Sequence, residues 1–237
     1  MARLYAGTSG WSYPSWKPDF YPAKLPSKKF LEFYATRLNS VELNVTFRRF
    51  ATASMQQGWI SVTPAEFRFS VKAHQNITHV LRMRNAEEFT RSFLGSLQPM
   101  AEAGKLGTVL FQLPPFLKCD AALLADFLTL LPRAARPAFE FRHASWFRDE
   151  VYKLLADSGA ALCVAESEKL EVPEVATADF LYFRLRKPEY SPAERTEIAN
   201  KTRGHLAAGR DVFVYFKHEE TPDGARYAEE LLKTLQA

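Results

Sequence analysis

The amino-acid sequence predicts an α/β fold, a single (β/α)8 barrel of the TIM type over residues 1–237. Three observations predict it: eight strand-like runs follow one another, helical patterns separate most of them, and the strands carry polar residues on one face. Eight strand–helix units in 237 residues take about 30 residues each, which fits the length typical of a TIM barrel. The sequence contains no recognisable linker, so one domain is expected.

The polar face of the strands separates the barrel from its rival, an open doubly wound sheet. From Val41 to Phe47, apolar residues stand at odd positions and polar residues at even ones, and the pattern recurs in later strands. Side chains alternate between the two faces of a strand, so one face is apolar and the other is charged. Central strands of a doubly wound sheet are buried on both faces and are nearly all apolar. The charged faces therefore favour a barrel with a polar mouth.

The eight strands are expected to be parallel, because helical segments connect them. In chain order they are predicted over residues 2–8, 40–47, 67–73, 107–113, 137–142, 160–165, 180–186 and 211–217.

Helices in the first half of the chain are predicted from capping residues and apolar spacing. Ser27 caps a helix whose apolar side chains fall on one face. After Phe50 there is room for two or three turns only. A third helix carries apolar residues at helical spacing from Phe89 to Met100, and Pro99 is expected to kink or end it.

The second half of the chain gives similar signals. Asp120 caps a helix, and a further helix ends at Gly159. The segment after Glu166 is too short for a full helix, so the barrel is expected to be irregular there as well as after the second strand. Ser191 and the following proline open the next helix, and Pro222 starts the last one.

Composition excludes several classes of protein. With 47% hydrophobic and 14% aromatic residues the chain can build a large core, and it has no apolar run long enough to span a membrane. The N-terminus enters a strand without a secretory signal, so a cytoplasmic protein is expected. Cys119 and Cys163 are too far apart to predict a disulfide framework or a cysteine zinc site. A net charge of +4 and a pI near 9.0 are compatible with anionic partners. The oligomeric state is not predicted.

Several ordered motifs spread over the chain carry a family resemblance. They are Gly7-Thr8-Ser9-Gly10-Trp11, Val41-Glu42-Leu43-Asn44, Phe69-Ser70-Val71-Lys72, Leu110-Phe111-Gln112-Leu113-Pro114-Pro115 and Glu140-Phe141-Arg142-His143. In these motifs the chain resembles the YecE-like family, also called domain of unknown function 72. The resemblance implies a fold similar to TIM barrels and implies no established activity. Two positions depart from many members: Lys217 and His218 replace an asparagine pair, and the seventh strand lacks a histidine near its end.

Charged residues on the predicted strands are unevenly balanced. The two strand-borne carboxylates are Glu42 and Glu140, and the six strand-borne cations are Arg68, Lys72, Arg142, Arg184, Arg186 and Lys217. A buried cation without a partner costs several kcal/mol, roughly. The surplus therefore predicts an anionic ligand, a phosphate or a carboxylate, which arginine forks suit. The alternative is that the cations pair with the two glutamates, with backbone carbonyls and with water.

Four residues are candidates for catalysis. Lys72, near other cations, is expected to have a lowered pKa and to act as a base or a Schiff-base nucleophile; alternatively it binds the anion as a point charge. Glu42 and Glu140 form an acid/base pair or two plain salt bridges. His79 lies in the loop after the third strand and is expected to carry a proton or to cap the next helical segment.

Ten further residues are candidates for ligand binding, because TIM barrels carry chemistry at the carboxyl ends of their strands. They are Thr8, Ser9, Trp11, Asn44, Gln112, Arg142, His143, Arg184, Arg186 and Lys217. The glycine-rich turn at Ser9 offers backbone N–H groups to an anion. Trp11 opens an aromatic cluster that either packs as a cap or stacks against a ring. His143 is either a hydrogen-bonded structural residue or a ligand.

A metal is the remaining alternative for the cofactor, which the sequence does not identify. Carboxylate and imidazole ligands would come from Glu42, Glu140, His143, Glu166 and His218. They lack diagnostic spacing, and the cationic surroundings oppose a dication, so no metal site is predicted.

These residues favour an enzyme that acts on a small anionic molecule by acid/base chemistry at the barrel mouth. Barrels often bind phosphate near strands seven and eight, which makes a phosphorylated substrate the first guess. Two alternatives remain: a protein that binds or processes nucleic acid, which the pI and the aromatic cluster suggest, and an anion-binding module without catalysis.

Overall fold

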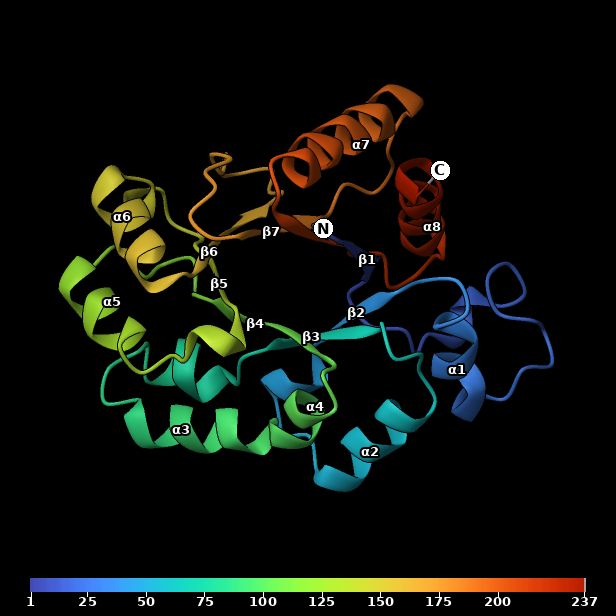
Figure 1. Ribbon diagram of the computed structural model, residues 1–237, viewed down its shortest axis with the longest axis horizontal. Coiled ribbons are helices and arrows are strands. Elements are labelled where there is room, and N and C mark those ends of the chain that lie inside the picture. The colour runs from blue at the N-terminus through green and yellow to red at the C-terminus, as the bar shows by residue number, and fades with distance from the viewer. Residues whose placement is uncertain (237) are drawn as a thin grey trace.

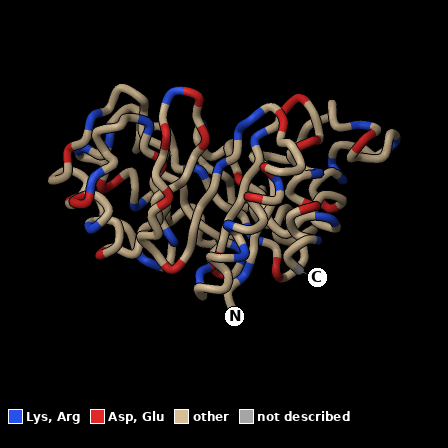
Figure 2. Tube along the Cα trace, turned by 90° about the horizontal axis from the view of Figure 1, so that it is seen from above, with Lys and Arg blue, Asp and Glu red and all other residues tan. Residues whose placement is uncertain are grey.

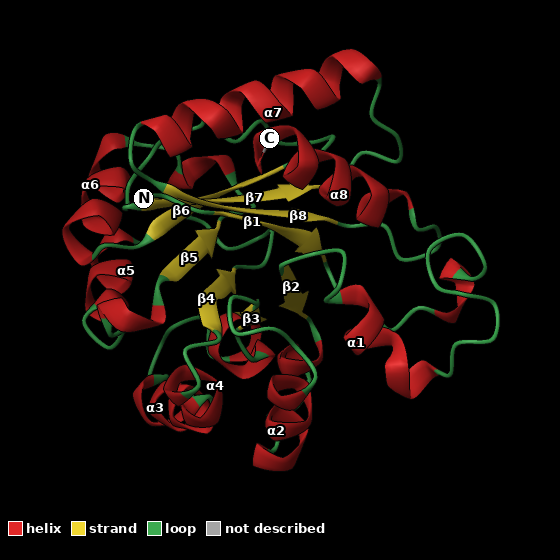
Figure 3. Ribbon diagram, turned by 45° about the vertical axis from the view of Figure 1, so that its right-hand side comes forward, coloured by secondary structure: helices red, strands yellow, loops and turns green. Residues whose placement is uncertain are grey.

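The computed structural model describes residues 1–236, and it shows the predicted (β/α)8 barrel (Figures 1 and 3). Eight parallel strands form one sheet in the order β1-β8-β7-β6-β5-β4-β3-β2. The strands are β1 (Leu4–Thr8), β2 (Ser40–Leu43), β3 (Arg68–Lys72), β4 (Leu106–Gln112), β5 (Pro137–Glu140), β6 (Ala161–Ala165), β7 (Phe180–Leu185) and β8 (Asp211–Phe216).

The helices lie outside the strands (Figure 1). They are α1 (Phe30–Tyr34), α2 (Ala53–Ser61), α3 (Glu87–Ser96), α4 (Gln98–Glu102), α5 (Ala121–Leu128), α6 (Asp149–Ser158), α7 (Pro192–Ala207) and α8 (Asp223–Gln236). Pro99 stands in the first turn of α4, so the predicted third helix is split in two there. No helix of residues 1–236 separates β6 from β7, as the short segment after Glu166 predicted.

Two strands end two or more residues earlier than the sequence predicted. β2 stops at Leu43, and residues 45–47 form a 3₁₀ turn. The hydroxyl of Thr46 donates to the backbone carbonyls of Leu43 and Lys72, which bends the chain toward β3 instead of along the barrel. β5 stops at Glu140 and leaves Arg142 in the loop. The alternating pattern continues past the point where each strand loses its neighbour, and this caused both errors.

Side chains largely replace the backbone ladder where β1 meets β2. One bridge, between Ser9 and Glu42, joins the two edges in parallel. Below it, the Asn39 amide donates to the carbonyl of Leu4 at 2.8 Å and accepts from the N–H of Ala6 at 2.9 Å. The hydroxyl of Tyr34 donates to the carbonyl of Ser40 and accepts from a β1 amide, both at 2.9 Å. These bonds satisfy the backbone groups at the seam.

The barrel interior is layered from one end to the other. Stacked aromatic rings, Tyr5 on Phe213, lie toward the amino ends of the strands. Above them the Tyr215 hydroxyl lies 2.5 Å from Ser40 Oγ and 2.7 Å from Ser70 Oγ. Charged side chains form the layer at the carboxyl ends. Polarity therefore increases toward the mouth, as the alternation predicted.

Lysines and arginines are interspersed with acidic residues along the traced chain (Figure 2). Within residues 1–236, no helix has the length and apolar character needed to cross a membrane.

Candidate active site

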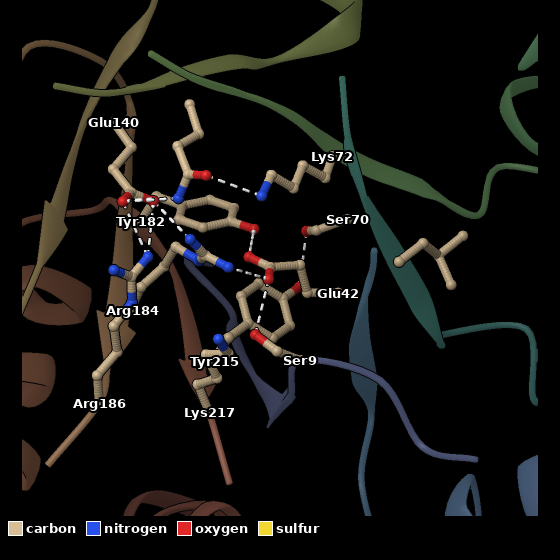
Figure 4. A network of polar contacts seen from close by, with 12 residues as sticks. Ser9, Glu42, Ser70, Lys72, Glu140, Tyr182, Arg184, Arg186, Tyr215 and Lys217 are labelled. Carbon is tan, nitrogen blue, oxygen red and sulfur yellow. Dashed lines mark hydrogen bonds and ion pairs between the residues drawn. The ribbon is translucent and has the colours of Figure 1, made fainter. Parts of the chain in front are cut away.

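One arginine joins two glutamates in the charged layer (Figure 4). Arg184, from β7, places Nη2 at 2.7 Å from Glu42 Oε1 and Nη1 at 2.5 Å from Glu140 Oε2. All three side chains are at most 3% exposed. The sequence left Glu42 and Glu140 as an acid/base pair or two plain salt bridges, and the Arg184 guanidinium lies between them. A planar fork is suited to holding two carboxylates at once.

Glu42 is fully hydrogen-bonded. It accepts from Ser9 Oγ and from the Tyr182 hydroxyl, each at 2.7 Å, besides Arg184. Burial alone would raise the pKa of Glu42, but the Arg184 charge and the hydrogen bonds that Glu42 accepts together outweigh it, and the pKa is lowered. Burial and the Glu42 charge raise the pKa of the Tyr182 phenol, so it stays a donor. Glu42 is thus a fixed anion and a weak base.

Glu140 is held in a similar way. The Gln112 amide donates to Oε1 at 2.8 Å, and Arg186 Nη2 lies 2.8 Å from the same oxygen. Burial works to raise the pKa of Glu140, yet Arg184 and Arg186 lower it to about 2. Because both carboxylates are committed to arginines, we assign them a positioning role. The alternative of plain salt bridges, left open by the sequence, describes Glu42 and Glu140 better than acid/base catalysis.

Lys72 stands apart from this neutral network. Its Nζ donates to Gln112 Oε1 at 2.8 Å and lies 4.2 Å from the centroid of the Phe47 ring. No ion pair among residues 1–236 includes it. Burial, then the charge of Arg184, lowers the pKa of Lys72 to about 8. The structure therefore gives Lys72 the environment that the sequence suggested for a base or nucleophile.

His79 contacts the same aromatic ring as Lys72. Its imidazole stands edge-on to Phe47 with ring centroids 5.0 Å apart, and its Nδ1 lies 2.8 Å from the Thr78 hydroxyl. Burial and the Lys72 charge lower the pKa of His79, which leaves the ring neutral near pH 7. An imidazole that is neutral near pH 7 is suited to accepting a proton.

Three cations line the rim above the network. Arg142 is 42% exposed, with Nε 4.0 Å from Glu140, and Lys217 is 45% exposed, with Nζ 3.6 Å from Glu219. Arg186 is partly exposed beside a cleft of about 970 Å³ that residues 164–172 also line. Arg184, by contrast, is buried below them and cannot contact a ligand in the mouth without leaving its carboxylates. The expected role of Arg184 in ligand binding is therefore corrected to a structural one.

Arg68 does not belong to the site, although it shares a strand face with Lys72. It lies at the amino end of β3 and donates to the carbonyls of Ala65 and Phe67. The cation surplus at the mouth is thus smaller than predicted.

Several predicted ligand-binding groups are already engaged within the fold. The N–H groups of Ser9 and Gly10 donate to the carbonyls of Phe216 and Glu42, so the glycine-rich turn offers no N–H pair to an anion. Thr8 Oγ1 donates to the carbonyl of Gly10 at 2.6 Å. His143 Nδ1 accepts from the N–H of Ser145 and caps a 3₁₀ turn. These groups hold loops in place.

Asn44 and Trp11 remain near the mouth with different surroundings. Asn44 directly follows β2 and starts the 3₁₀ turn without capping it through its side chain. Trp11 stands edge-on to Trp59 at 5.8 Å, and its carbonyl accepts from Tyr21. The rest of the aromatic cluster is packed around the buried Trp16, which fits a cap.

The residues considered as metal ligands make other contacts in the structure. Glu166 accepts from the N–H of Arg186 at 2.6 Å and from the Tyr190 hydroxyl. His218 Nε2 donates to the carbonyl of Pro188 at 3.0 Å. Within residues 1–236, no three His, Cys, Asp or Glu side chains gather as a metal site.

Sequence reasoning missed two residues of the site. Tyr182 lies two positions before Arg184 on the same strand face, so the alternation that selected Arg184 could have found it. Phe47 was assigned to the apolar face of a longer second strand. The early end of β2 instead places its ring beneath Lys72.

Fold and geometry together define the chain as a parallel (β/α)8 barrel with a charged site at the carboxyl ends of its strands. Residues 5–237 match the model of the family described as "Protein of unknown function DUF72", and the chain belongs to that family. The resemblance to YecE-like proteins is thereby confirmed.

Similar proteins extend this result. The chain is 33% identical over 156 residues to the UPF0759 protein YunF of Bacillus subtilis, which is 63% of this chain and 54% of YunF. It is 30% identical over 145 residues to the UPF0759 protein YecE of Escherichia coli K12, 61% of this chain and 50% of YecE. The matches thus span about half the length of these relatives.

Among solved structures, a DUF72 family protein of Thermotoga maritima superposes with a TM-score of 0.86 and 27% identity. The match covers 99% of this chain and 100% of that one.

Proposed function

We propose that the chain is an enzyme whose active site is the mouth of the barrel and whose substrate is a small organic anion. The observation that carries the proposal is Lys72, a largely buried amine without a carboxylate partner among residues 1–236, next to carboxylates that two arginines neutralise. A substrate anion would supply the missing negative charge.

The rim supports the same proposal. At the mouth, Arg142 Nε lies 4.0 Å from the buried Glu140, at the limit of an ion pair, and the exposed pair of Lys217 with Glu219 is of a kind worth about 0–1 kcal/mol. Both cations are therefore free to rearrange onto a phosphate or a carboxylate. Arg186 also has a buried Nε–H that makes no hydrogen bond within residues 1–236, so one of its donors is unpaired. In this proposal Lys72 and His79 transfer protons and the arginines bind the anion.

Binding of small anions tests the proposal. Phosphate and glycolate are expected to raise the melting temperature of the protein. Lys72→Met should weaken their binding at least about tenfold, which is ~1.4 kcal/mol. Lys153→Met removes a lysine that is 74% exposed on α6 and serves as the matched control, with unchanged affinity. Failure of both anions to bind, or equal affinity in Lys72→Met and wild type, would sink the proposal.

The nucleic-acid alternative rests on the net charge of +4 and the cationic rim. It differs in its salt dependence. A protein that neutralises several phosphates loses affinity for a DNA duplex linearly on logarithmic axes as salt rises. Duplex binding with such a slope, reduced by Lys217→Met, would favour this alternative over a small substrate.

A further inference from the structure

Among the described residues, the buried Lys105 and the half-buried Lys72 have very different settings. Lys105 Nζ donates to three oxygens, the carbonyls of Ile60 and Thr63 and the Thr63 hydroxyl, at 2.6–3.0 Å. These acceptors hold an ammonium in place. Lys72 has a single protein acceptor, the amide oxygen of Gln112. With this single acceptor the ammonium form of Lys72 is weakly stabilised. The neutral amine, whose nitrogen is a nucleophile, is therefore easier to form.

Gln112 also fixes how the Lys72 amine is oriented. Glu140 is an anion and accepts only, so the NH₂ group of Gln112 must face it. The amide oxygen then faces Lys72 and takes one of its N–H groups. In a neutral amine this leaves the lone pair directed away from Gln112. The β4–β5 register, which pairs Gln112 with Glu140, maintains the arrangement.

The cationic neighbours favour the neutral amine as well. Burial and then the charge of Arg184 lower the pKa of Lys72 to about 8, against the opposing charges of Glu42 and Glu140. A lysine that only binds an anion profits from a permanent charge, whereas a nucleophilic lysine must lose its proton. Lys72 therefore fits nucleophilic chemistry better than a point-charge role.

We propose that Lys72 forms a Schiff base with its substrate, which makes that substrate a small organic anion with an aldehyde or ketone group. This inference rests on the proposed function. The Nζ lone pair forms a bond to the carbonyl carbon, and one N–H proton passes to the carbonyl oxygen, which becomes a hydroxyl. The second N–H proton then passes to this hydroxyl, the C–O bond breaks and water leaves, and a C=N bond results. His79 contacts the same Phe47 ring as Lys72.

Reductive trapping tests this chemistry. The protein is incubated at pH 8 with glyoxylate and cyanoborohydride, and the modified lysines are identified by peptide mass spectrometry. Lys72 is expected to be modified at least about tenfold faster than exposed lysines such as Lys153, since far more of it is unprotonated at this pH. Lys72→Arg keeps the charge but cannot form an imine, so its trapping at this position disappears.

Glycolate, which has no aldehyde or ketone group, separates the two proposals. Glycolate binding together with glyoxylate modification spread evenly over surface lysines would overturn the Schiff base and leave the anion site standing. Absence of both glycolate binding and selective trapping would overturn both. Retained glycolate binding in Lys72→Arg, with trapping lost, supports the Schiff base and excludes a folding defect as the cause.

Discussion

Arg184→Met is expected to lower the free energy of unfolding by about 3–5 kcal/mol, because it leaves Glu42 buried without a cationic partner and Glu140 with Arg186 alone. For a chain of this size that corresponds to a fall in melting temperature of roughly 6–20 °C. Thermal and urea unfolding followed by circular dichroism measure the change. Lys153→Met, on the exposed face of α6, should stay within about 0.5 kcal/mol of wild type.

Two further results distinguish lost charge pairing from lost packing. Adding Glu42→Gln to Arg184→Met should recover part of the stability, since one buried charge is removed. The difference between wild type and Arg184→Met should also shrink as pH falls from about 4.5 to about 2. In the wild type the pKa of Glu140 is lowered to about 2, so the stability it contributes is present above its ordinary pKa and is lost over this range. If Arg184→Met lowers the free energy of unfolding by less than about 1 kcal/mol, the conclusion that Arg184 stabilises the buried glutamates is contradicted.

Gly7→Ala is expected to destabilise the barrel by at least about 3 kcal/mol through overpacking at its seam. A Cβ at Gly7 would lie 1.8 Å from the carbonyl oxygen of Ser40 and 2.7 Å from the Tyr34 hydroxyl. The first is a backbone atom, so relief requires β1 and β2 to separate. That movement would break the hydrogen bonds of Tyr34 that connect the two strands.

Gly58→Ala provides the matched control for Gly7→Ala. Gly58 lies on exposed α2, and a Cβ there meets nothing within 4 Å. Alanine favours a helix over glycine, so this change should stabilise the protein by roughly 0.5–1 kcal/mol. Urea unfolding of both variants compares the two effects. Equal stability of the two alanine variants would show that the seam tolerates a side chain.

The sequence predicted the barrel because period-two alternation reports directly on the two faces of a strand. It selected Glu42, Glu140 and Arg184 as inward-facing residues, and all three lie in the barrel. The same pattern does not predict how far along the barrel axis each inward-facing residue lies. Arg68 and Lys72 share one face of β3, yet only Lys72 reaches the mouth. Depth depends on where each strand begins relative to its neighbours, which is a property of the closed sheet.

The sequence also did not indicate which oppositely charged residue each charged side chain would contact. Arg184 lies 142 residues from Glu42 and 44 from Glu140 in the sequence, and only closure of the barrel brings them together. The Phe47 ring beneath Lys72 depends on the early end of β2, which a Thr46 hydrogen bond to β3 decides. Local patterns supplied the list of site residues, and long-range packing decided which of them neutralise one another.

Titration of the Lys72 side chain tests most directly whether the barrel mouth contains a reactive amine. The chemical shift of its Nζ can be followed by NMR in protein labelled with ¹⁵N-lysine, with the signal assigned by its loss in Lys72→Arg. We expect a pKa of about 8, with the proton lost as pH rises through that value, because burial and Arg184 disfavour the ammonium. A titration midpoint of Lys72 at the ordinary lysine value of about 10.4 would contradict the claim that the barrel mouth contains a reactive amine.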